Sequence, residues 1–555
     1  MRKLFILWTL SVLVLLPVPL ALGCRPAAEA AAQHNDRGID LGKEGRYTEA
    51  IAEFIMAIRE DPELAEAYSN RAYAYTKKGE YDKAIADCDK AIELDANLAL
   101  AYVNRAYAYT KKGEYDKAIA DCDKAIELNP NLDLAYSNQA YAYTKKGEYD
   151  KAIADCDKAI ELDANLALAY SSRAYAYTKK GEFDKAIADC NKAIEMVPEL
   201  AKAYLYRGYA YSWKGEIDME VADYSKAIEL DPNLAEAYVN RGAAYVEKGE
   251  FDKAIADYDK AIELDPNLAL AYNSRAYAYT KKGEYDKAIA DYNKAIELDP
   301  KLAEAYANRG AAYVEKGDFD KAIADCDRAI ELAPELAQAY YTRGLAYANK
   351  GDFDKAIADC DRAIELDPEL AMAYANRGAA YVEKGEFDKA IADCDKAIEL
   401  NPELAQAYFT RGLVYHRKGD FDKAIVDYDK AIELDSQLAQ AYNNRGLVYY
   451  GKGEFDKAIA DCDKAIELNS EFALAYNNRG LAYHEKGDFD KAIADYGKAI
   501  QLNPTSGFTY YCRGYAYAAK GELRKAVSDF EKCIELSSAP WLVEMAQQEL
   551  RKLGK

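Results

Sequence analysis

The stretch AEAYSNRAYAYTKKGEYDKAIADCDKAIELDANL, residues 65 to 98, decides the fold because its pattern returns throughout the chain. Rows of 34 residues laid out from Ala31 align fifteen times without an insertion or deletion and fill residues 31–540. In the quoted row, apolar residues stand at row positions 1, 4, 8 and 11, and again at 17, 20, 21, 24, 27 and 28. Both sets have the spacing of an amphipathic helix. Each row therefore predicts two helices.

The signals between the helices are also repeated. Glycine stands at position 15 of all fifteen rows, where a tight turn needs a residue that tolerates positive φ. Proline occupies position 32 in ten rows, as at Pro62 and Pro300, and is expected to end the second helix. No linker rich in Gly, Ser or Pro divides the chain, which favours one extended array of helix pairs.

The unit resembles the tetratricopeptide repeat (TPR) family, whose 34-residue pattern is W-x2-L-G-x2-Y, then A-x3-F, then P. Here the unit reads Y-x2-R-[GA]-x2-Y, then A-x3-[CYF], then P, for example at Tyr306, Arg309, Gly310, Tyr313, Ala322, Cys326 and Pro334. The resemblance covers everything after residue 30. It implies an all-α fold, a right-handed superhelical α-solenoid of fifteen helix-turn-helix repeats, in which first helices line a concave groove. Residues 541–555 are expected to form a capping helix, with Trp541, Met545 and Leu553 against the last pair.

Two departures from the family pattern concern charge. Position 7 is arginine in fourteen rows and Gln139 in one, while position 23 is aspartate in fourteen rows and Glu53 in one. We expect a ladder in which each arginine meets a carboxylate in or beside its own repeat. A row of arginines displayed for anionic ligands is disfavoured, because position 7 lies beside the packing face. Row six has Glu220 where the other rows have alanine, so a partner, a local kink or an irregular joint is expected there.

Eight cysteines share position 24, which is tyrosine or phenylalanine in the other rows: Cys88, Cys122, Cys156, Cys190, Cys326, Cys360, Cys394 and Cys462. Such a position requires bulk in a core. Equivalent residues of neighbouring repeats are at least one helix spacing apart, about 8–10 Å. Disulfides need Cα atoms within about 7 Å, and zinc needs sulfurs about 2.3 Å from one ion. We therefore expect buried, inert thiols.

Candidate binding residues lie on the first helix, at positions 2, 5, 6, 9, 12 and 13. Position 6 is asparagine in eight rows: Asn70, Asn104, Asn138, Asn240, Asn308, Asn376, Asn444 and Asn478. A carboxamide can bond the backbone of an extended peptide whatever its side chains. Similar ladders line the TPR groove of O-linked N-acetylglucosamine transferases, although no glycosyltransferase domain is expected here. The alternative is a polar helix face repeated by gene duplication.

Positions 9 and 13 divide the array. Early rows combine tyrosine at position 9 with lysine at position 13: Tyr73, Tyr107, Tyr141 and Tyr175 with Lys77, Lys111, Lys145 and Lys179. Later rows prefer alanine or leucine at position 9 and carry Glu315, Glu383 and Glu485 at position 13. The predicted groove is therefore aromatic and basic at its N-terminal end and acidic at its C-terminal end, which could orient a partner. The lysine at position 5 on which the carboxylate clamp of chaperone-binding TPR proteins depends occurs in no row.

The N-terminus has the order typical of a signal peptide. Arg2 and Lys3 precede an apolar core, and LALGC ends the segment at Cys24. This ending resembles a bacterial lipoprotein box. The resemblance implies a signal peptide over residues 1–23, lipidation of Cys24 and a short tether over residues 24–30. The chain would then be exported and anchored by lipid to the outer side of a bacterial membrane or in the periplasm.

Two alternatives stay open for this segment. Residues 21–23, Ala-Leu-Gly, also fit cleavage by the ordinary signal peptidase, which would give a secreted protein. An uncleaved anchor is disfavoured because Pro17 and Pro19 interrupt a core that is already short for a membrane span. In every version the chain leaves the cytoplasm.

These patterns favour a protein-binding scaffold that is not an enzyme. No nucleophile with its base, phosphate loop or Cys/His cluster with ligand spacing occurs in the sequence, so we predict no catalytic residue, metal site or cofactor. The formal net charge of −23 opposes nucleic-acid binding. The expected partners are other proteins or extended peptides, with the oligomeric state open. The rivals are an envelope glycan binder that uses the tyrosines and a structural spacer without a groove ligand.

Overall fold

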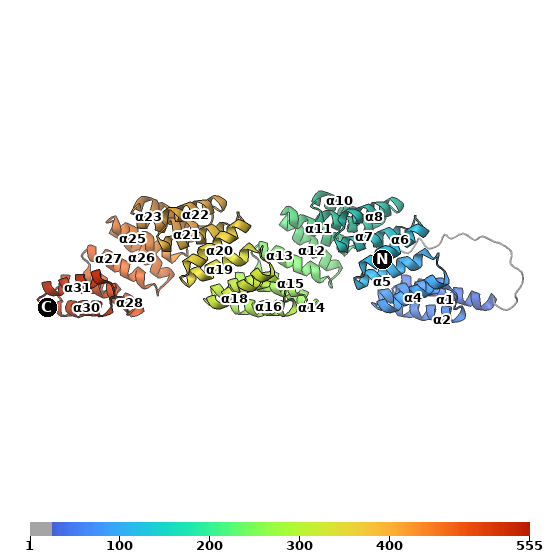
Figure 1. Cartoon of the computed structure of the whole chain (residues 1–555), viewed down its shortest axis with the longest axis horizontal. Coiled ribbons are helices and arrows are strands. Elements are labelled where there is room, and N and C mark those ends of the chain that lie inside the picture. Colours follow the sequence, from blue (N-terminus) through green and yellow to red (C-terminus); the bar gives the residue numbers. More distant parts are fainter. Residues whose placement is uncertain (1–24) are drawn as a thin grey trace. The chain divides into compact units, whose positions relative to one another are not determined.

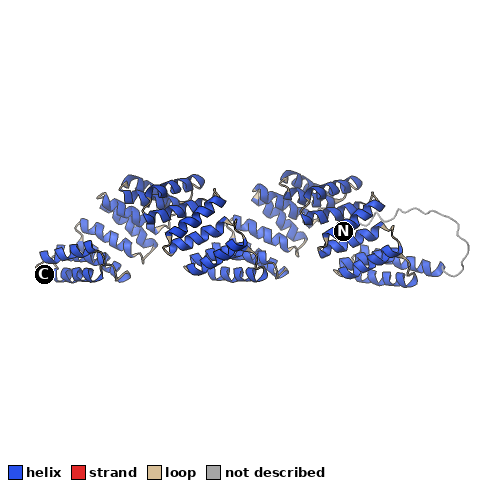
Figure 2. Ribbon diagram, in the orientation of Figure 1, coloured by secondary structure: helices blue, strands red, loops and turns tan. Residues whose placement is uncertain are grey.

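The computed structural model describes residues 25–555, which consist of helices, turns and short connections without a strand (Figure 2). The expected signal peptide and Cys24 lie outside the described residues. Residues 25–30, expected as a tether, are already part of the first helix, in keeping with their alanine-rich sequence. The chain divides into two compact units, and the division falls between residues 278 and 279.

The helices follow one another in pairs along the chain (Figure 1). Unit 1 contains α1 (Arg25–Lys43), α2 (Tyr47–Glu60), α3 (Ala65–Lys77), α4 (Tyr81–Leu94), α5 (Ala99–Lys112), α6 (Tyr115–Leu128), α7 (Asp133–Lys146), α8 (Tyr149–Leu162), α9 (Ala167–Lys179), α10 (Phe183–Met196), α11 (Ala201–Lys214), α12 (Ile217–Leu230), α13 (Ala235–Glu247), α14 (Phe251–Leu264) and most of α15 (Ala269–Lys281).

Unit 2 continues the same alternation of first and second helices. It contains α16 (Tyr285–Leu298), α17 (Ala303–Glu315), α18 (Phe319–Leu332), α19 (Ala337–Asn349), α20 (Phe353–Leu366), α21 (Ala371–Lys384), α22 (Phe387–Leu400), α23 (Ala405–Lys418), α24 (Phe421–Leu434), α25 (Ala439–Gly451), α26 (Phe455–Leu468), α27 (Ala473–Glu485), α28 (Phe489–Leu502), α29 (Gly507–Ala519), α30 (Leu523–Leu536) and α31 (Pro540–Lys552). The predicted all-α solenoid of helix pairs is confirmed.

The glycine at position 15 makes the turn inside each pair. All fifteen of these glycines have φ between 71° and 81°, from Gly45 to Gly521. Residues with a Cβ rarely adopt this left-handed conformation. The turn expected from the sequence is therefore confirmed in every repeat.

The second helices end at the same place whether or not proline follows. α4 ends at Leu94 although its row has alanine at position 32, because Asp95 accepts a hydrogen bond of 2.9 Å from the backbone N–H of Asn97. Asp or Asn holds position 31 in most rows, and the rows with Val197 and Ala333 there have proline next. The sequence thus contains two alternative stop signals, of which we expected only the proline.

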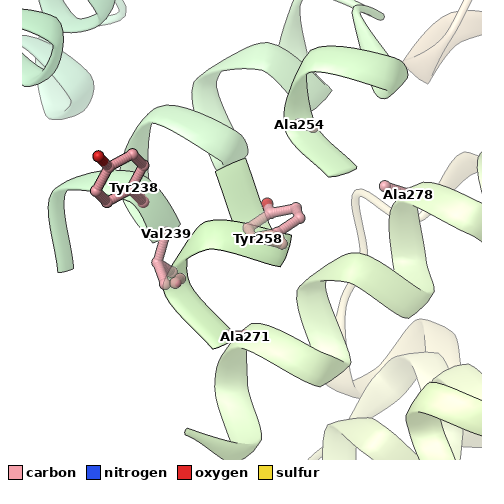
Figure 3. Close-up of a cluster of buried hydrophobic side chains, with 7 residues drawn as sticks. Tyr238, Val239, Ala254, Tyr258, Ala271 and Ala278 are labelled. Carbon is pink, nitrogen blue, oxygen red and sulfur yellow. The ribbon is translucent and has the colours of Figure 1, made fainter. Parts of the chain in front are cut away.

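The core between the helices combines one large side chain with small ones. Tyr258 of α14 is 2% exposed and packs with Tyr238 and Val239 of α13 (Figure 3). Ala271 of α15 closes the same cluster. A Cβ added at Gly242 would lie 2.8 Å from the Tyr258 ring. Position 8 therefore makes room for the aromatic ring at position 24.

The kink expected at Glu220 is absent. α12 is fourteen residues long, like the other second helices, and the N–H of Glu220 donates to the carbonyl of Glu216 at 3.0 Å. The Glu220 side chain is only 3% exposed. Burial raises the pKa of this carboxyl to about 7, against a hydrogen bond to Ser212 that lowers it. A neutral carboxyl is far less costly to bury than a carboxylate, so the pair stays regular.

A helix follows the last pair as expected, but it buries a different face. Leu542 and Ala546 of α31 are 4% and 0% exposed and pack against α30, with Leu553 partly buried beside them. Trp541 and Met545, which we expected to cover the pair, are 57% and 39% exposed. Adjacent residues lie about 100° apart around a helix, so only one of these two faces can contact α30.

Candidate functional site: the first-helix face

Within each unit, the candidate binding residues lie on the side of the stacked repeats that the first helices form. First helices of successive repeats contact each other, α3 with α5, α5 with α7 and α7 with α9, while each second helix packs against first helices. Side chains at positions 2, 5, 6, 9, 12 and 13 of the first helices are therefore brought together from repeat to repeat. We call these side chains the first-helix face.

The asparagines at position 6 bind the preceding repeat. Asn70 Nδ2 donates to Asn35 Oδ1 at 3.0 Å, and Asn104 Nδ2 donates to the carbonyl oxygen of Ser69 at 3.0 Å. Asn138 makes the same contact to Val103 at 3.4 Å. Sequence reasoning missed this role, because the partner lies 35 residues upstream. A carboxamide has two donor hydrogens and an acceptor oxygen. Asn104 also donates to Ser69 Oγ at 3.0 Å, which leaves its acceptor oxygen for a ligand, whereas Asn70 and Asn138 keep a donor hydrogen as well.

The other five asparagines occupy varied surroundings. Asn240 donates to Tyr209 Oη at 3.0 Å and to the carbonyl of Glu236 at 2.6 Å. Asn478 is buried and donates to Asn443 Oδ1 at 2.9 Å. The Oδ1 of Asn444 accepts a hydrogen bond from Asn443 at 3.1 Å. Asn376 has a buried Nδ2 without a partner within the described residues. Asn308 is half-buried. The eight asparagines are thus similar in place but not in bonding.

The tyrosines and lysines of rows two to five form a stripe. Each exposed lysine at position 13 lies over the half-buried ring at position 9 of its own helix, at 5.2 Å for Lys77 and Tyr73, 5.4 Å for Lys111 and Tyr107, 5.5 Å for Lys145 and Tyr141, and 5.3 Å for Lys179 and Tyr175. We call these eight residues the lysine–tyrosine stripe. The distances are those of cation–π contacts.

An aromatic cluster closes the stripe at row six. Tyr206 takes the place of asparagine at position 6, and its ring centroid lies 4.8 Å from that of Tyr175. Tyr209 donates to Glu236 Oε1 at 2.5 Å, and burial together with this carboxylate raises the pKa of Tyr209. The cluster was not foreseen, because its members come from three first helices.

The first-helix face of unit 2 has a different chemistry. Glu383 pairs with Arg417 at 3.4 Å, and Tyr450 donates to Glu485 at 3.5 Å. The His416 ring lies edge-on to Phe421 and the His484 ring lies tilted against Phe489, with ring centroids 6.0 and 5.1 Å apart. Burial lowers the pKa of both imidazoles.

The arginines at position 7 are structural. Arg105 makes a bidentate bond to Asp121 of its own repeat, with Nε and Nη2 donating at 2.8 and 2.7 Å. Its Nη1 donates to Asp89 of the preceding repeat at 2.6 Å. The same three bonds recur at Arg173, Arg343, Arg377, Arg411, Arg445 and Arg479. The predicted ladder is confirmed, and it also links neighbouring repeats.

One rung of the ladder lacks its cation. Gln139 Nε2 keeps the bond to the preceding repeat, at 2.6 Å from Asp123 Oδ1. Asp155, the carboxylate that arginine would fork, has a buried Oδ2 without a partner in the described part of the chain. Burial, and then the charge of Asp123, raises the pKa of Asp155 to about 7.

The position-24 cysteines are packing residues, as predicted. They are free and at most 1% exposed. Burial raises their thiol pKa, to about 12 for Cys360, Cys394 and Cys462, so that the reactive thiolate is disfavoured. Within residues 25–555 no group of three or more His, Cys, Asp or Glu side chains is placed to hold a metal ion.

Shallow recesses of about 270 and 320 Å³ lie beside the turns of rows thirteen and five. Lys214 borders the second recess and pairs with Asp184 at 2.9 Å. Their charged groups already have partners, so the recesses offer no better site than the first-helix face. Of the helices in the described part, none combines the length and apolarity needed to cross a membrane.

Helix pairs of constant length, glycine turns and an arginine–aspartate ladder define a repeat scaffold. Sequence models described as "Tetratricopeptide repeat" match residues 65–98, 99–132, 134–166, 167–200, 303–336, 337–370, 371–404, 394–426, 439–472, 473–506 and 509–540. Models described as "TPR repeat" match residues 41–79, 214–249, 242–283, 276–317 and 412–453. The chain belongs to the tetratricopeptide repeat family, whose arrays are scaffolds for protein–protein interaction. A comparison with curated proteins gave no match.

One solved structure shares the fold, and two others are similar at lower TM-scores. The chain is similar to a structure described as "Crystal structure of APC/C hetero-tetramer Cut9-Hcn1", with 18% identity, a TM-score of 0.52, and 88% of this chain and 96% of that chain covered. It is also similar to a tetratricopeptide repeat protein from Parabacteroides merdae (22% identity, 45% and 98% covered, TM-score 0.39) and to yeast Tom70 (22%, 81% and 99%, TM-score 0.36). At 18% identity the likeness to the first of these structures shows the fold alone.

Proposed function

We propose that the protein is a non-enzymatic scaffold that holds extended peptide segments of partner proteins on its first-helix face. The observation that carries this proposal is the repetition, on one side of successive first helices, of carboxamides with spare hydrogen-bonding capacity beside exposed lysines. Backbone groups of an extended chain would bond the carboxamides, and side chains would meet the residues at positions 9 and 13.

The N-terminal sequence supports a location for this scaffold. A basic start, an apolar core and LALGC ending at Cys24 support export and a lipid anchor at the outer side of a bacterial membrane. Changing Cys24→Ser should release the protein from isolated membranes. Retention on membranes with the first residues intact would instead indicate an uncleaved anchor.

Binding of extended peptides tests the proposed function directly. A triple change of Asn70, Asn104 and Asn138 to alanine should abolish binding of an immobilised peptide library. These side chains also bond the preceding repeat, so circular dichroism must first show that the triple variant is folded. The matched control changes Lys90, Lys124 and Lys158, exposed on the second helices, to alanine and should bind as the wild type does.

The glycan alternative gives the opposite result. Sugar stacking needs open ring faces, but a lysine ammonium lies over each tyrosine of the stripe. If Tyr→Ala changes at 107, 141 and 175 remove binding to isolated cell wall while no peptide binds the wild type, the proposed function is wrong.

A further inference from the structure

We propose that the lysine–tyrosine stripe selects acidic extended segments whose carboxylates stand at alternate residues. The inference rests on the proposed function and names its partner class. Such a segment would lie across α3, α5, α7 and α9, with one carboxylate for each repeat.

The lysines of the stripe differ from the other lysines of the same repeats. In row three, Lys112 pairs with Asp82 at 2.7 Å, Lys117 with Glu114 at 2.6 Å and Lys124 with Glu127 at 3.0 Å. Lys111 instead contacts the Tyr107 ring at 5.4 Å, and no carboxylate of the described residues lies within ion-pair distance of it. The same holds for Lys77, Lys145 and Lys179. An acidic protein thus keeps a row of cations without carboxylate partners on its candidate binding face.

The rest of the first-helix face has few carboxylates that could neutralise these lysines. On the first-helix face of rows two to five, Glu66 is the one carboxylate among the described residues. Leu100, Leu134 and Leu168 take its place in the next three rows. The chain as a whole carries a formal charge of −23, so this patch is a local reversal of sign. Complementary charge favours an acidic partner and opposes a basic one.

The ring spacing at each end of the stripe fits an extended chain. The ring centroids of Tyr73 and Tyr107, in successive repeats, are 6.4 Å apart, and those of Tyr175 and Tyr209 are 6.3 Å apart. Two residues of an extended strand advance about 6.6 Å, and their side chains point to the same side. Lys77 Nζ lies 5.2 Å from both the Tyr73 and the Tyr107 ring, between two repeats. Alternate carboxylates would therefore meet successive lysines.

The lysine ammonium groups can bind carboxylates that approach from different directions. A lysine ammonium acts as a flexible point charge and does not impose the planar, bidentate arrangement of arginine. The carboxamides of Asn70, Asn104 and Asn138 stand seven residues before each lysine, on the same side of the helix, where they can bond the peptide backbone. Charge would then select the sequence and the carboxamides would hold the chain.

Two peptides of equal composition test the spacing. Fluorescence anisotropy of the full chain in detergent would compare a labelled peptide of six Glu-Ser repeats with one that has six Glu followed by six Ser, and with a Gln-Ser version. We expect the alternating peptide to bind most tightly, the block peptide several-fold more weakly, and added salt to weaken both. Equal affinity for all three peptides would overturn the inference.

A matched pair of quadruple variants tests the site. Changing Lys77, Lys111, Lys145 and Lys179 to glutamine should weaken binding of the alternating peptide by about tenfold or more, as expected for several exposed ion pairs. The control changes Lys90, Lys124, Lys158 and Lys192 to glutamine, which removes the same charge from the second helices of the same repeats. An equal loss in both variants would show a general effect of net charge and contradict the site.

The outcomes also separate this inference from the proposed function. If Gln-Ser peptides bind and acidic peptides do not, the inference fails while peptide binding stands. If no peptide binds but a polyuronate oligosaccharide does, the occupant is an anionic glycan and both proposals fail.

Discussion

Residue 139 shows what the arginine ladder contributes. In rows three and five the position-7 arginine neutralises two carboxylates, as Arg105 does for Asp121 and Asp89. Gln139 satisfies Asp123 alone and leaves Asp155 Oδ2 buried without a partner in the described residues. Row four therefore lacks the charge-assisted contact between its own two helices that rows three and five have, while it keeps its bond to row three.

Changing Gln139→Arg should therefore stabilise unit 1. A charge-assisted bidentate bond to a half-buried carboxylate is worth about 1–3 kcal/mol. Urea unfolding followed by circular dichroism should show a higher midpoint for Gln139→Arg and a lower one for the mirror change Arg105→Gln. An unchanged midpoint in both variants would mean that the ladder does not contribute to stability.

Two acids whose pKa is raised to about 7 predict a pH dependence. Asp155 and Glu220 have pKa values of about 7 in the folded chain, against ordinary values of 3.8 and 4.5. Burial is the main cause, and Asp123 and Glu247 add to it. Between these limits the folded state binds more protons than the unfolded state, so stability falls as pH rises from about 4 to 7.

Thermal unfolding at pH 5 and pH 8 measures this dependence. Between pH 5 and pH 8 the unfolding temperature should drop further in the wild type than in the double variant Asp155→Asn and Glu220→Gln, in which neither group titrates. Parallel curves for the two proteins would refute the assignment of these groups.

At the scale of the element, replacing a turn glycine should destabilise the protein through backbone conformation alone. Gly317 has φ +78°, and an added Cβ would meet nothing within 4 Å. Gly317→Ala should lower the unfolding free energy by about 1–2 kcal/mol, because L-residues are strained in this region. The control Gly42→Ala also meets nothing within 4 Å but lies inside α1, where alanine is favoured. Urea midpoints should move in opposite directions, and a loss of stability at both positions would contradict the argument.

The capping helix gives a second matched pair. Leu542→Ala should uncover the core of α30 and cost about 2–5 kcal/mol, the usual range for a buried leucine. Trp541→Ala, at a side chain that is 57% exposed, should change stability by about 0.5 kcal/mol or less. Hydrogen exchange of α30 is the readout, and faster exchange in Trp541→Ala than in Leu542→Ala would reverse our assignment of the buried face.

The repeat period made most elements predictable. Position 15 could be assigned to a positive φ because only glycine occurs there in all rows. The helix ends were harder, since Asp95 and its counterparts act through a local side-chain bond that mimics the effect of proline. The face of α31 was missed because Trp541 and Leu542 are adjacent apolar residues and periodicity alone does not choose between them.

At the scale of the molecule, a repeat array has no single core, and each pair depends on its neighbours. Sequence reasoning therefore predicted the fold from one row but missed contacts made between rows. The bond from Asn104 to Ser69 joins residues 35 apart, and the Tyr206 cluster draws on three first helices. The stripe was predictable in composition, but the contact of Lys77 with two rings was not.

The most direct test of the central claim is hydrogen exchange of the full chain with and without the alternating Glu-Ser peptide. Binding on the first-helix face predicts slower exchange in α3, α5, α7 and α9 and unchanged exchange in α4, α6 and α8. Protection confined to second helices, or to the helices of unit 2, would contradict it.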